Sequence, residues 1–429
     1  MTARDLERKD VVVRDLWESH SHRRPAENAS KVIVARQPIC RRSSSVFAYE
    51  ILYRSEFLEK AAVTNGDEAT AGVLVKTFME IGLDRLVGKT TAFLNLTRQF
   101  LLSDYCFILP KGRVVLEVLE NIEPDDQVIR ALTKLRKAGY SIALDDFQFS
   151  EDKRPLLQVA DYVKMDFRAE TPSTLVQQIP ILRKFKIKLL AEKVETQEEF
   201  EFAKALGFDY FQGYFFCRPK IVSAARIPLN KVSALRLIMR LQDPNLSITN
   251  LERIITQDVA LSFKLLRYVN SALLSLTSRI ESVAHAIQMI GTRRIRSWAS
   301  IIMLTTLEDK PAELMITAVV RAAMAERLAS ALSIPKKDSC FTIGLFSVVD
   351  ALLDLPMPEA LELLPFSDDV KQALMDGKGP LGLILRCILA YERGNWSQAN
   401  CQGLDLRTIS QCYLDSIIEA RDLFAPFDA

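Results

Sequence analysis

Acidic and amide residues recur at one kind of position in the first half of the chain, within or at the end of short apolar runs. Glu50, Asn95, Glu117 and Asp145 each occupy such a position, and Asp146 follows directly. Burying a carboxylate or an amide on a strand costs several kcal/mol unless a partner compensates it. Carboxylate and amide oxygens are the ligands that Mg²⁺ and Mn²⁺ prefer. The pattern therefore predicts an oxygen-ligand metal site on a β/α scaffold.

Strand-like and helical patterns alternate over residues 31–222 and would supply that scaffold. The expected strands are 32–37, 46–53, 92–96, 113–118, 141–145, 162–166, 188–192 and 209–215. The expected helices are 67–87, 124–137, 173–184 and 197–206. Strands interleaved with helices favour parallel βαβ units, and about eight strands close a TIM-like (β/α) barrel.

The first two expected strands depart from the parallel order. Only residues 38–45 separate them, and a parallel pair needs a crossover of about a dozen residues or more. We therefore expect these two strands to pair antiparallel, which gives a barrel with one antiparallel strand.

The second half of the chain shows helical spacing and no convincing alternating strand. Its expected helices are 232–240, 251–255, 260–271, 283–290, 295–307, 314–331 and 348–353. Residues 1–30 carry many charges with little periodicity. The sequence thus predicts a charged flexible segment (1–30), an α/β barrel domain (31–222) and an all-α domain (223–429).

Composition restricts the class of protein. The net charge of +2 over 429 residues gives no electrostatic reason to expect a nucleic-acid polymer or a membrane as partner. No membrane-length apolar stretch and no signal peptide are found, so a cytoplasmic location is expected. Seven cysteines without a C-x-x-C pair indicate buried thiols. Only three histidines occur, which argues against zinc hydrolases and Ser-His triads.

Seven short motifs follow one another between residues 31 and 220. They are Glu50-Ile51-Leu52-Tyr53-Arg54, Asn95-Leu96-Thr97, Glu117-Val118-Leu119-Glu120, Asp145-Asp146-Phe147, Lys164-Met165-Asp166, Ala191-Glu192-Lys193-Val194-Glu195-Thr196, and Gln212-Gly213-Tyr214 with Arg218-Pro219. In this order they resemble the motifs of EAL domains, the cyclic di-GMP phosphodiesterase family. Each motif alone is weak evidence, and their common order makes the resemblance specific.

The resemblance implies a site for two divalent cations, Mg²⁺ or Mn²⁺, which would supply an activated water and a charge clamp on phosphorus. The implied ligands of the first cation are Glu50, Asn95, Glu117 and Asp145, and Asp146 would serve the second cation or the bridging water. Arg54 would bind a phosphate through its planar guanidinium.

The resemblance also implies catalytic roles for three further residues. Lys164 would offset developing charge, Glu192 would act as general base or outer ligand, and Gln212 would orient the site. Supporting roles would fall to Glu120, which would brace the loop after Asp146, and to Asp166 and Glu195. For Glu195, a functional role and a structural one, fixing Lys193 and the start of the next helix, both stay open.

Two departures from the family pattern concern the second cation. After Asp145-Asp146-Phe147 the family has a glycine-rich loop linked to second-metal binding and dimer coupling, whereas residues 148–155 of this chain contain no glycine. Without glycine the loop loses access to positive φ, so second-metal binding is expected to be impaired. Lys193 replaces a glycine beside Glu192 and adds a positive charge whose effect the sequence does not define.

The helical half carries a second resemblance. Residues 258–271, 280–283 and 286–291 are similar to the signature segments of HDOD domains, all-helical relatives of HD hydrolases. HD-type hydrolysis needs several histidines and an aspartate, but this chain reads Ser347-Val348-Val349-Asp350 at the expected His-Asp pair. His285 is the only histidine in the region and is expected in the core. The resemblance implies an output module with a protein partner.

Other acidic residues are predicted to be structural. Asp125 and Asp126 follow Pro124 at a helix start, where acids complement the helix dipole. Thr196 and Glu199 have the spacing of a capping box.

The sequence leads to one principal prediction and two alternatives. The principal prediction is a metal-dependent phosphodiesterase that hydrolyses cyclic di-GMP to linear pGpG. The first alternative is a degenerate EAL domain that binds cyclic di-GMP or a protein and signals through the HDOD domain without turnover. The second is a scaffold that neither binds nor hydrolyses the nucleotide. Homodimer formation stays open. The retained ligands favour the enzyme, and the lost glycine loop favours the sensor.

Overall fold

The computed structural model describes residues 32–55, 82–219, 229–243, 245–272, 280–307, 309–334, 337–401 and 403–424. These residues form two compact units, and the chain passes from the first to the second after Phe215. The predicted flexible segment 1–30, most of the predicted helix 67–87 and the predicted boundary at 222/223 lie outside the described residues.

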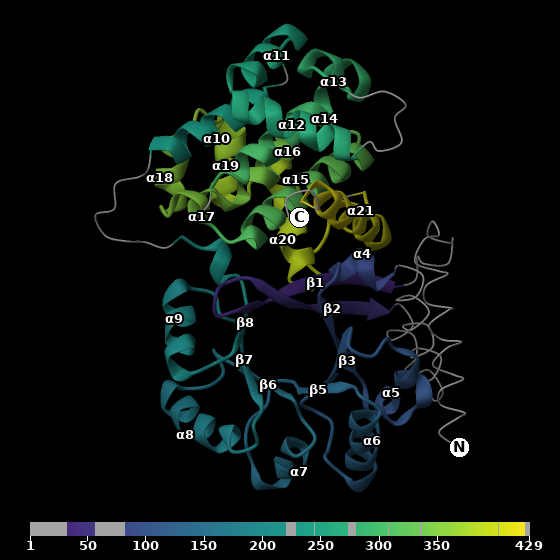
Figure 1. Ribbon diagram of the computed structural model, residues 1–429. Helices are drawn as coiled ribbons and strands as arrows, with labels where there is room; N and C mark the ends of the chain where they lie inside the picture. Colours follow the sequence, from purple (N-terminus) through teal and green to yellow (C-terminus); the bar gives the residue numbers. More distant parts are fainter. Residues whose placement is uncertain are drawn as a thin grey trace. The chain divides into compact units, whose positions relative to one another are not determined.

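Eight strands close a barrel in the first unit, in the order β1 to β8 (Figure 1). They are β1 (Val32–Arg41), β2 (Val46–Ser55), β3 (Thr91–Leu96), β4 (Val114–Val118), β5 (Ser141–Leu144), β6 (Tyr162–Asp166), β7 (Lys188–Glu192) and β8 (Tyr210–Gln212). Strands β2 to β8 pair parallel, and β1 pairs antiparallel with both β2 and β8. The predicted TIM-like barrel with one antiparallel strand is confirmed.

Strand β1 is longer than predicted and runs through Pro38. This proline faces Tyr49 of β2, while β8 pairs only with Ile39–Arg41. Proline has no N–H to donate, so a strand tolerates it where one side of the ladder is unpaired.

Short helices connect the strands and lie outside the ring of strands (Figure 1). They are α4 (Leu83–Val87), α5 (Arg98–Leu102), α6 (Asp126–Lys137), α7 (Arg154–Leu157), α8 (Pro172–Arg183) and α9 (Gln197–Leu206). Two predicted helix starts are confirmed. The Asp125 side chain accepts hydrogen bonds from the N–H groups of Gln127 and Val128, and Thr196 with Glu199 forms a capping box.

The barrel interior is built as an apolar layer beneath a polar layer. The apolar layer is the buried cluster of Ile39, Ala48, Phe93, Val115, Ala143 and Leu190, with Tyr162 and Tyr210 packed against it. Side chains two residues apart on a strand point to the same side. Each strand therefore adds a polar side chain two residues from its apolar one, as Phe93 and Asn95 do on β3. We call Gln37, Glu50, Asn95, Glu117, Asp145, Lys164, Glu192 and Gln212 the polar layer.

The second unit contains helices and no strand among its described residues. The helices are α10 (Leu229–Leu241), α11 (Ile248–Gln257), α12 (Val259–Ala272), α13 (Val283–Ile290), α14 (Thr292–Leu304), α15 (Ala312–Ala331), α16 (Lys337–Leu345), α17 (Val349–Leu353), α18 (Met357–Glu362), α19 (Asp368–Asp376), α20 (Gly379–Glu392) and α21 (Leu406–Phe424). The prediction of an all-α second half is confirmed for this part of the chain.

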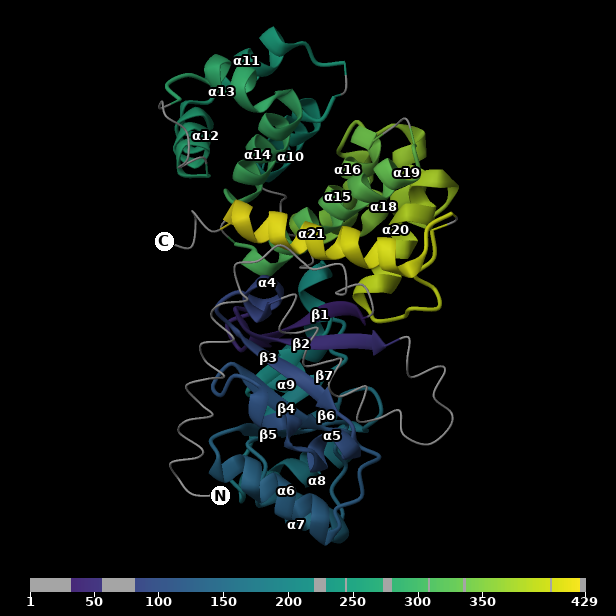
Figure 2. The same cartoon turned by 90° about the vertical axis from the view of Figure 1, so that its right-hand side faces the viewer.

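Helix α15 forms the centre of the second unit and packs against α16 and α21 (Figure 2). At Gly344 of α16, an added Cβ would come within 2.5 Å of the Ala322 backbone, so these two helices need glycine at their contact. The prediction for His285 is wrong. It is half-buried on α13, because Val283, Ala286 and Ile287 take the buried face of this short helix.

No helix in the described part of the chain is both long and apolar enough to span a membrane.

Candidate active site

Lys164 contacts four carboxylates of the polar layer. Its Nζ atom lies 3.1 Å from Glu50 Oε2, 2.9 Å from Glu117 Oε1, 2.8 Å from Asp145 Oδ1 and 2.9 Å from Glu192 Oε1. The lysine side chain is 1% exposed and that of Glu117 is fully buried. A single ammonium cannot neutralise four carboxylates, so the site either takes up protons or binds a further cation.

Two side-chain amides orient Glu50. Asn95 Nδ2 donates a hydrogen bond of 2.8 Å to Glu50 Oε1, and Gln212 Nε2 donates one of 2.7 Å to Glu50 Oε2. The Tyr53 hydroxyl donates to the main-chain carbonyl of Asn95 at 2.6 Å and so ties β2 to the end of β3. Both carboxylate oxygens of Glu50 thus accept a hydrogen bond from a side-chain amide.

Gln37 belongs to the site, although the sequence reasoning missed it. Its Oε1 atom accepts a hydrogen bond of 3.1 Å from Gln212 Nε2, and the residue pairs with Glu50 in the β1–β2 ladder. The alternation of side chains along β1 could have identified it. Because β1 runs antiparallel to its neighbours, its polar-layer residue comes two positions before its apolar-layer residue and not two positions after it. Ile39 lies in the apolar layer, so Gln37 must lie in the polar one.

Gly213 holds the end of β8 close to the loop after β7. An added Cβ would lie 1.9 Å from the Val194 carbonyl oxygen, and its φ of +145° is open chiefly to glycine. Val194 N–H in turn donates to the Gln212 carbonyl at 3.0 Å. The glycine of the Gln-Gly-Tyr motif thus sets the position of Gln212.

The acids of the polar layer differ in the direction in which their pKa values are shifted. Burial raises the pKa of Glu117 well above its usual range, and the nearby charges of Glu50 and Asp145 add to this effect. Burial likewise raises the pKa of Asp145 and raises that of Glu192 to about 8. For Glu50, burial acts in the same direction, but Lys164 and the hydrogen bonds from Gln212 and Asn95 outweigh it and lower the pKa. Hydrogen bonds and the lysine thus favour the ionised form of Glu50, whereas burial opposes ionisation of Glu117 and Glu192.

We expect the cation-free barrel to lose stability as the pH rises. The folded-state pKa values of Glu117, Asp145 and Glu192 lie above their unfolded values, so the folded state holds protons that the unfolded state has released. Stability is then lost as the pH rises through the folded pKa, which for Glu192 is about 8. Hydrogen-exchange protection factors of β4 and β7, measured with EDTA at about pH 6 and about pH 8.5, test this. Equal protection at both values would contradict the expectation, and Mg²⁺ should restore protection at the higher pH.

In the described part of the chain, the buried side-chain polar atoms without a hydrogen-bond partner belong to the polar layer or to the adjacent Asp146. The buried side-chain atoms that lack a hydrogen-bond partner are Asn95 Oδ1, Glu117 Oε2, Asp146 Oδ1, Glu192 Oε2 and Gln212 Oε1, while Glu117 Oε1 has the Lys164 ammonium at 2.9 Å. All are oxygens, and buried acceptors are seldom left without a partner. This donor set fits a hard divalent cation such as Mg²⁺ or Mn²⁺.

The four carboxylates of the polar layer all contact Lys164 and are not arranged around an empty position. Among the described residues, no three His, Cys, Asp or Glu side chains surround one point as they would surround a bound ion.

The remaining predicted residues lie around this layer. Asp146 and Asp166 both contact Lys193, whereas Glu195 forms an ion pair of 2.6 Å with Arg168. The functional and the structural role predicted for Glu195 both stay predictions. Exposed Glu120 lines a cavity of about 270 Å³ together with Asp146 and Asp166.

Arg54 is half-buried and lies on β2, four residues beyond Glu50 on the same side of the strand. It is thus placed towards the carboxyl end of the barrel.

A closed (β/α) barrel with an acidic layer, followed by an all-helical unit, defines an EAL-type domain joined to an HDOD-type domain. The EAL domain model matches residues 89–219, and the HDOD domain model matches residues 227–361. The Glu50–Arg54 motif thus lies ahead of the matched part of the EAL domain.

Two relatives match almost the whole chain. Cyclic di-GMP phosphodiesterase CdgJ of Vibrio cholerae is 32% identical over 417 residues, which cover 94% of this chain and 95% of CdgJ. The uncharacterized protein YuxH of Bacillus subtilis is 32% identical over 401 residues, which cover 90% of this chain and 97% of YuxH. The chain belongs to the family of EAL–HDOD proteins that includes CdgJ, and the two resemblances seen in the sequence are confirmed.

A solved structure shows a more distant likeness. The Klebsiella pneumoniae BlrP1 complex with manganese and cyclic di-GMP is 24% identical, with 46% of this chain and 56% of that chain covered and a TM-score of 0.37.

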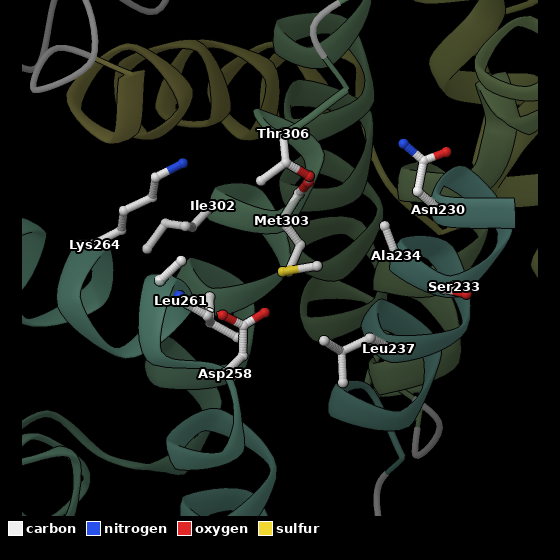
Figure 3. Close-up of a pocket in the computed structure, with 11 residues that line it drawn as sticks. Asn230, Ser233, Ala234, Leu237, Asp258, Leu261, Lys264, Ile302, Met303 and Thr306 are labelled. Atoms are coloured by element: carbon white, nitrogen blue, oxygen red, sulfur yellow. Dashed lines mark hydrogen bonds between the residues drawn. The ribbon is translucent and has the colours of Figure 1, made fainter. Parts of the chain in front are cut away.

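The helical unit contains a cavity of about 350 Å³, lined by residues of α10, α12 and α14 (Figure 3). Leu237, Leu261 and Met303 form part of its apolar lining, and Asp258, just before α12, and Lys264 of α12 add opposite charges. Asp258 is the only acid among these lining residues, and none of them is a histidine. The cavity thus offers apolar contacts with few charged groups.

Proposed function

We propose that this chain is a metal-dependent phosphodiesterase that hydrolyses cyclic di-GMP to linear pGpG. The observation that carries the proposal is the set of orphaned oxygens, all of which belong to the polar layer or to the adjacent Asp146. Active sites of TIM-like barrels occur at the carboxyl ends of the strands. The name of CdgJ, which matches along nearly the full length, supports the choice of substrate.

The proposed cation ligands are Glu50, Asn95, Glu117 and Asp145. When bound, Mg²⁺ or Mn²⁺ would supply an acidified water and a positive charge beside the phosphoryl oxygens. Gln212 and Asn95 keep Glu50 ionised and oriented through their hydrogen bonds. Lys164 keeps the acids together, because its charge attracts all four.

Glu192 is the proposed proton acceptor. A general base works best when its pKa is near the working pH, and burial raises the pKa of Glu192 to about 8. Its Oε2 atom has no hydrogen-bond partner and is the atom proposed to take the proton of the attacking water. Arg54 is proposed to bind a phosphate of the nucleotide, since it lies on the Glu50 side of β2.

The helical unit is proposed to pass the state of the barrel to a protein partner. Two large apolar side chains one turn apart on α12, Val259 and Phe263, are 80% and 66% exposed. Contiguous exposed apolar patches commonly mark interaction surfaces, and we propose that these two side chains belong to one.

Incubation of the full chain with cyclic di-GMP and Mg²⁺ or Mn²⁺ tests the proposed activity. We expect pGpG from the wild type and a loss of about 100-fold or more in Asp145→Asn, because loss of a supporting partner alone costs about 10–100-fold. Asp126→Asn, on an exposed acid at the start of α6, is the matched control and should keep full activity. Nucleotide binding without pGpG would establish the sensor instead, and absence of binding would leave the scaffold.

A further inference from the structure

Lys193 bridges two acids beside the polar layer. Its Nζ atom lies 2.5 Å from Asp166 Oδ2 and 3.5 Å from Asp146 Oδ2. Asp146 follows the end of β5, Asp166 ends β6, and Lys193 follows β7. One ammonium group therefore connects the carboxyl ends of three neighbouring strands.

Lys193 and Asp146, which form the 3.5 Å contact, both have an unfavourable backbone conformation. The φ angle is +57° at Lys193 and +38° at Asp146, in the left-handed region that non-glycine residues rarely adopt. Strain of this kind persists where the surrounding contacts determine the conformation, commonly at functional sites. At Lys193 the ion pairs to Asp146 and Asp166 are the contacts that a glycine could not make.

The surroundings of the bridge are acidic. The cavity of about 270 Å³ on this side is lined by Glu120, Asp146, Asp166 and Glu170, together with Lys153. Asp146 Oδ1 is buried and has no hydrogen-bond partner. These acids would attract a divalent cation, but the Lys193 ammonium already lies against two of them, Asp146 and Asp166. A second cation at Asp146 would be repelled at short range.

Protonation does not weaken the contact between Lys193 and Asp166 near neutral pH. Burial opposes ionisation of Asp166, but hydrogen bonds from Lys193 and from the Arg168 and Ala169 N–H groups outweigh it and lower its pKa. Burial also opposes the charge on Lys193, and the same contacts with Asp166 and Asp146 overcome it and raise the pKa. Both partners are therefore charged.

We propose that the Lys193 ammonium takes the place of a second divalent cation at Asp146 and Asp166, so that the chain binds a single divalent cation. This inference rests on the proposed function, because it concerns the same site. Lys193 would then be a positioning residue that fixes Asp146 and supplies positive charge without a metal.

Mn²⁺ binding to the full chain, measured by equilibrium dialysis without nucleotide, tests this proposal. We expect one Mn²⁺ per chain for the wild type and two for Lys193→Gly, with electron paramagnetic resonance showing coupling between the two ions in the variant. Lys193→Arg, which keeps the charge, should stay at one. Lys186→Gly is the matched control, because Lys186 is exposed, has a φ of +59° and precedes β7 at its other end. It should also stay at one.

Three outcomes would overturn the proposal: two Mn²⁺ in the wild type, no gain in Lys193→Gly, or a gain in Lys186→Gly. Hydrogen exchange of the barrel strands checks that Lys193→Gly is folded, and Lys193→Gln removes the charge without adding a glycine. The outcome is separable from that of the proposed function. A shift from one to two ions in a chain that forms no pGpG would support the lysine bridge and reject the enzyme.

Discussion

Replacement of Lys164 by methionine is expected to destabilise the barrel by about 3–5 kcal/mol near pH 8, the range measured when one partner of a buried ion pair is removed. The ammonium contacts Glu50, Glu117, Asp145 and Glu192, and no other cation among the described residues contacts these four acids. The loss should be smaller near pH 5, because acids with raised pKa values can take up protons once the lysine is gone.

The measurement must separate the barrel from the helical unit, because a chain of two units has no single unfolding free energy. Hydrogen exchange of β4, β6 and β7 reports on the barrel, and protection there should fall by about 100-fold or more, at tenfold for each 1.4 kcal/mol. Lys188→Met is the matched control, since the Lys188 side chain is 57% exposed and lies at the end of β7 opposite to Glu192. Equal effects of the two substitutions would show that Lys164 does not hold the acids together.

Replacement of Glu117 by glutamine is expected to lower turnover while leaving the stability of the barrel nearly unchanged. Turnover should fall by about 100-fold or more, because a proposed cation ligand is lost. Stability without cations should change by less than about 1 kcal/mol, because the buried carboxyl, whose pKa is raised well above its usual range, is exchanged for a neutral group of the same shape.

Paired measurements of pGpG formation and of exchange protection in β4 test this separation. Glu123→Gln, on an exposed acid beyond the same strand, is the control and should change neither quantity. A Glu117→Gln variant that unfolds, or one that keeps full turnover, would contradict the assignment of Glu117 as a ligand rather than a structural acid.

The barrel and its polar layer could be predicted because each depends on local pattern. Alternation along a strand fixes which side chains point inward, so Asn95 above Phe93 and Glu117 above Val115 follow from the residue order alone. The short segment between the first two strands was sufficient to predict the antiparallel pair. Ordered motifs then identified the family.

The contacts within the site could not be predicted in the same way. That Lys164 reaches four carboxylates depends on side chains from five strands meeting inside a closed ring, and no sequence spacing encodes this. Lys193 illustrates the same limit. Its position beside Glu192 was evident, but its effect depends on a positive φ and on the distance to Asp166.

The antiparallel pairing of β1 determines where the chain reaches the barrel. Val32 pairs with Ser55 at the carboxyl end of β2, the end at which the polar layer lies. In a barrel whose first strand is parallel to the others, the chain would arrive at the opposite end. A regulatory segment joined ahead of Val32 would therefore be delivered to the rim of the proposed substrate site, with no linker needed to pass around the barrel.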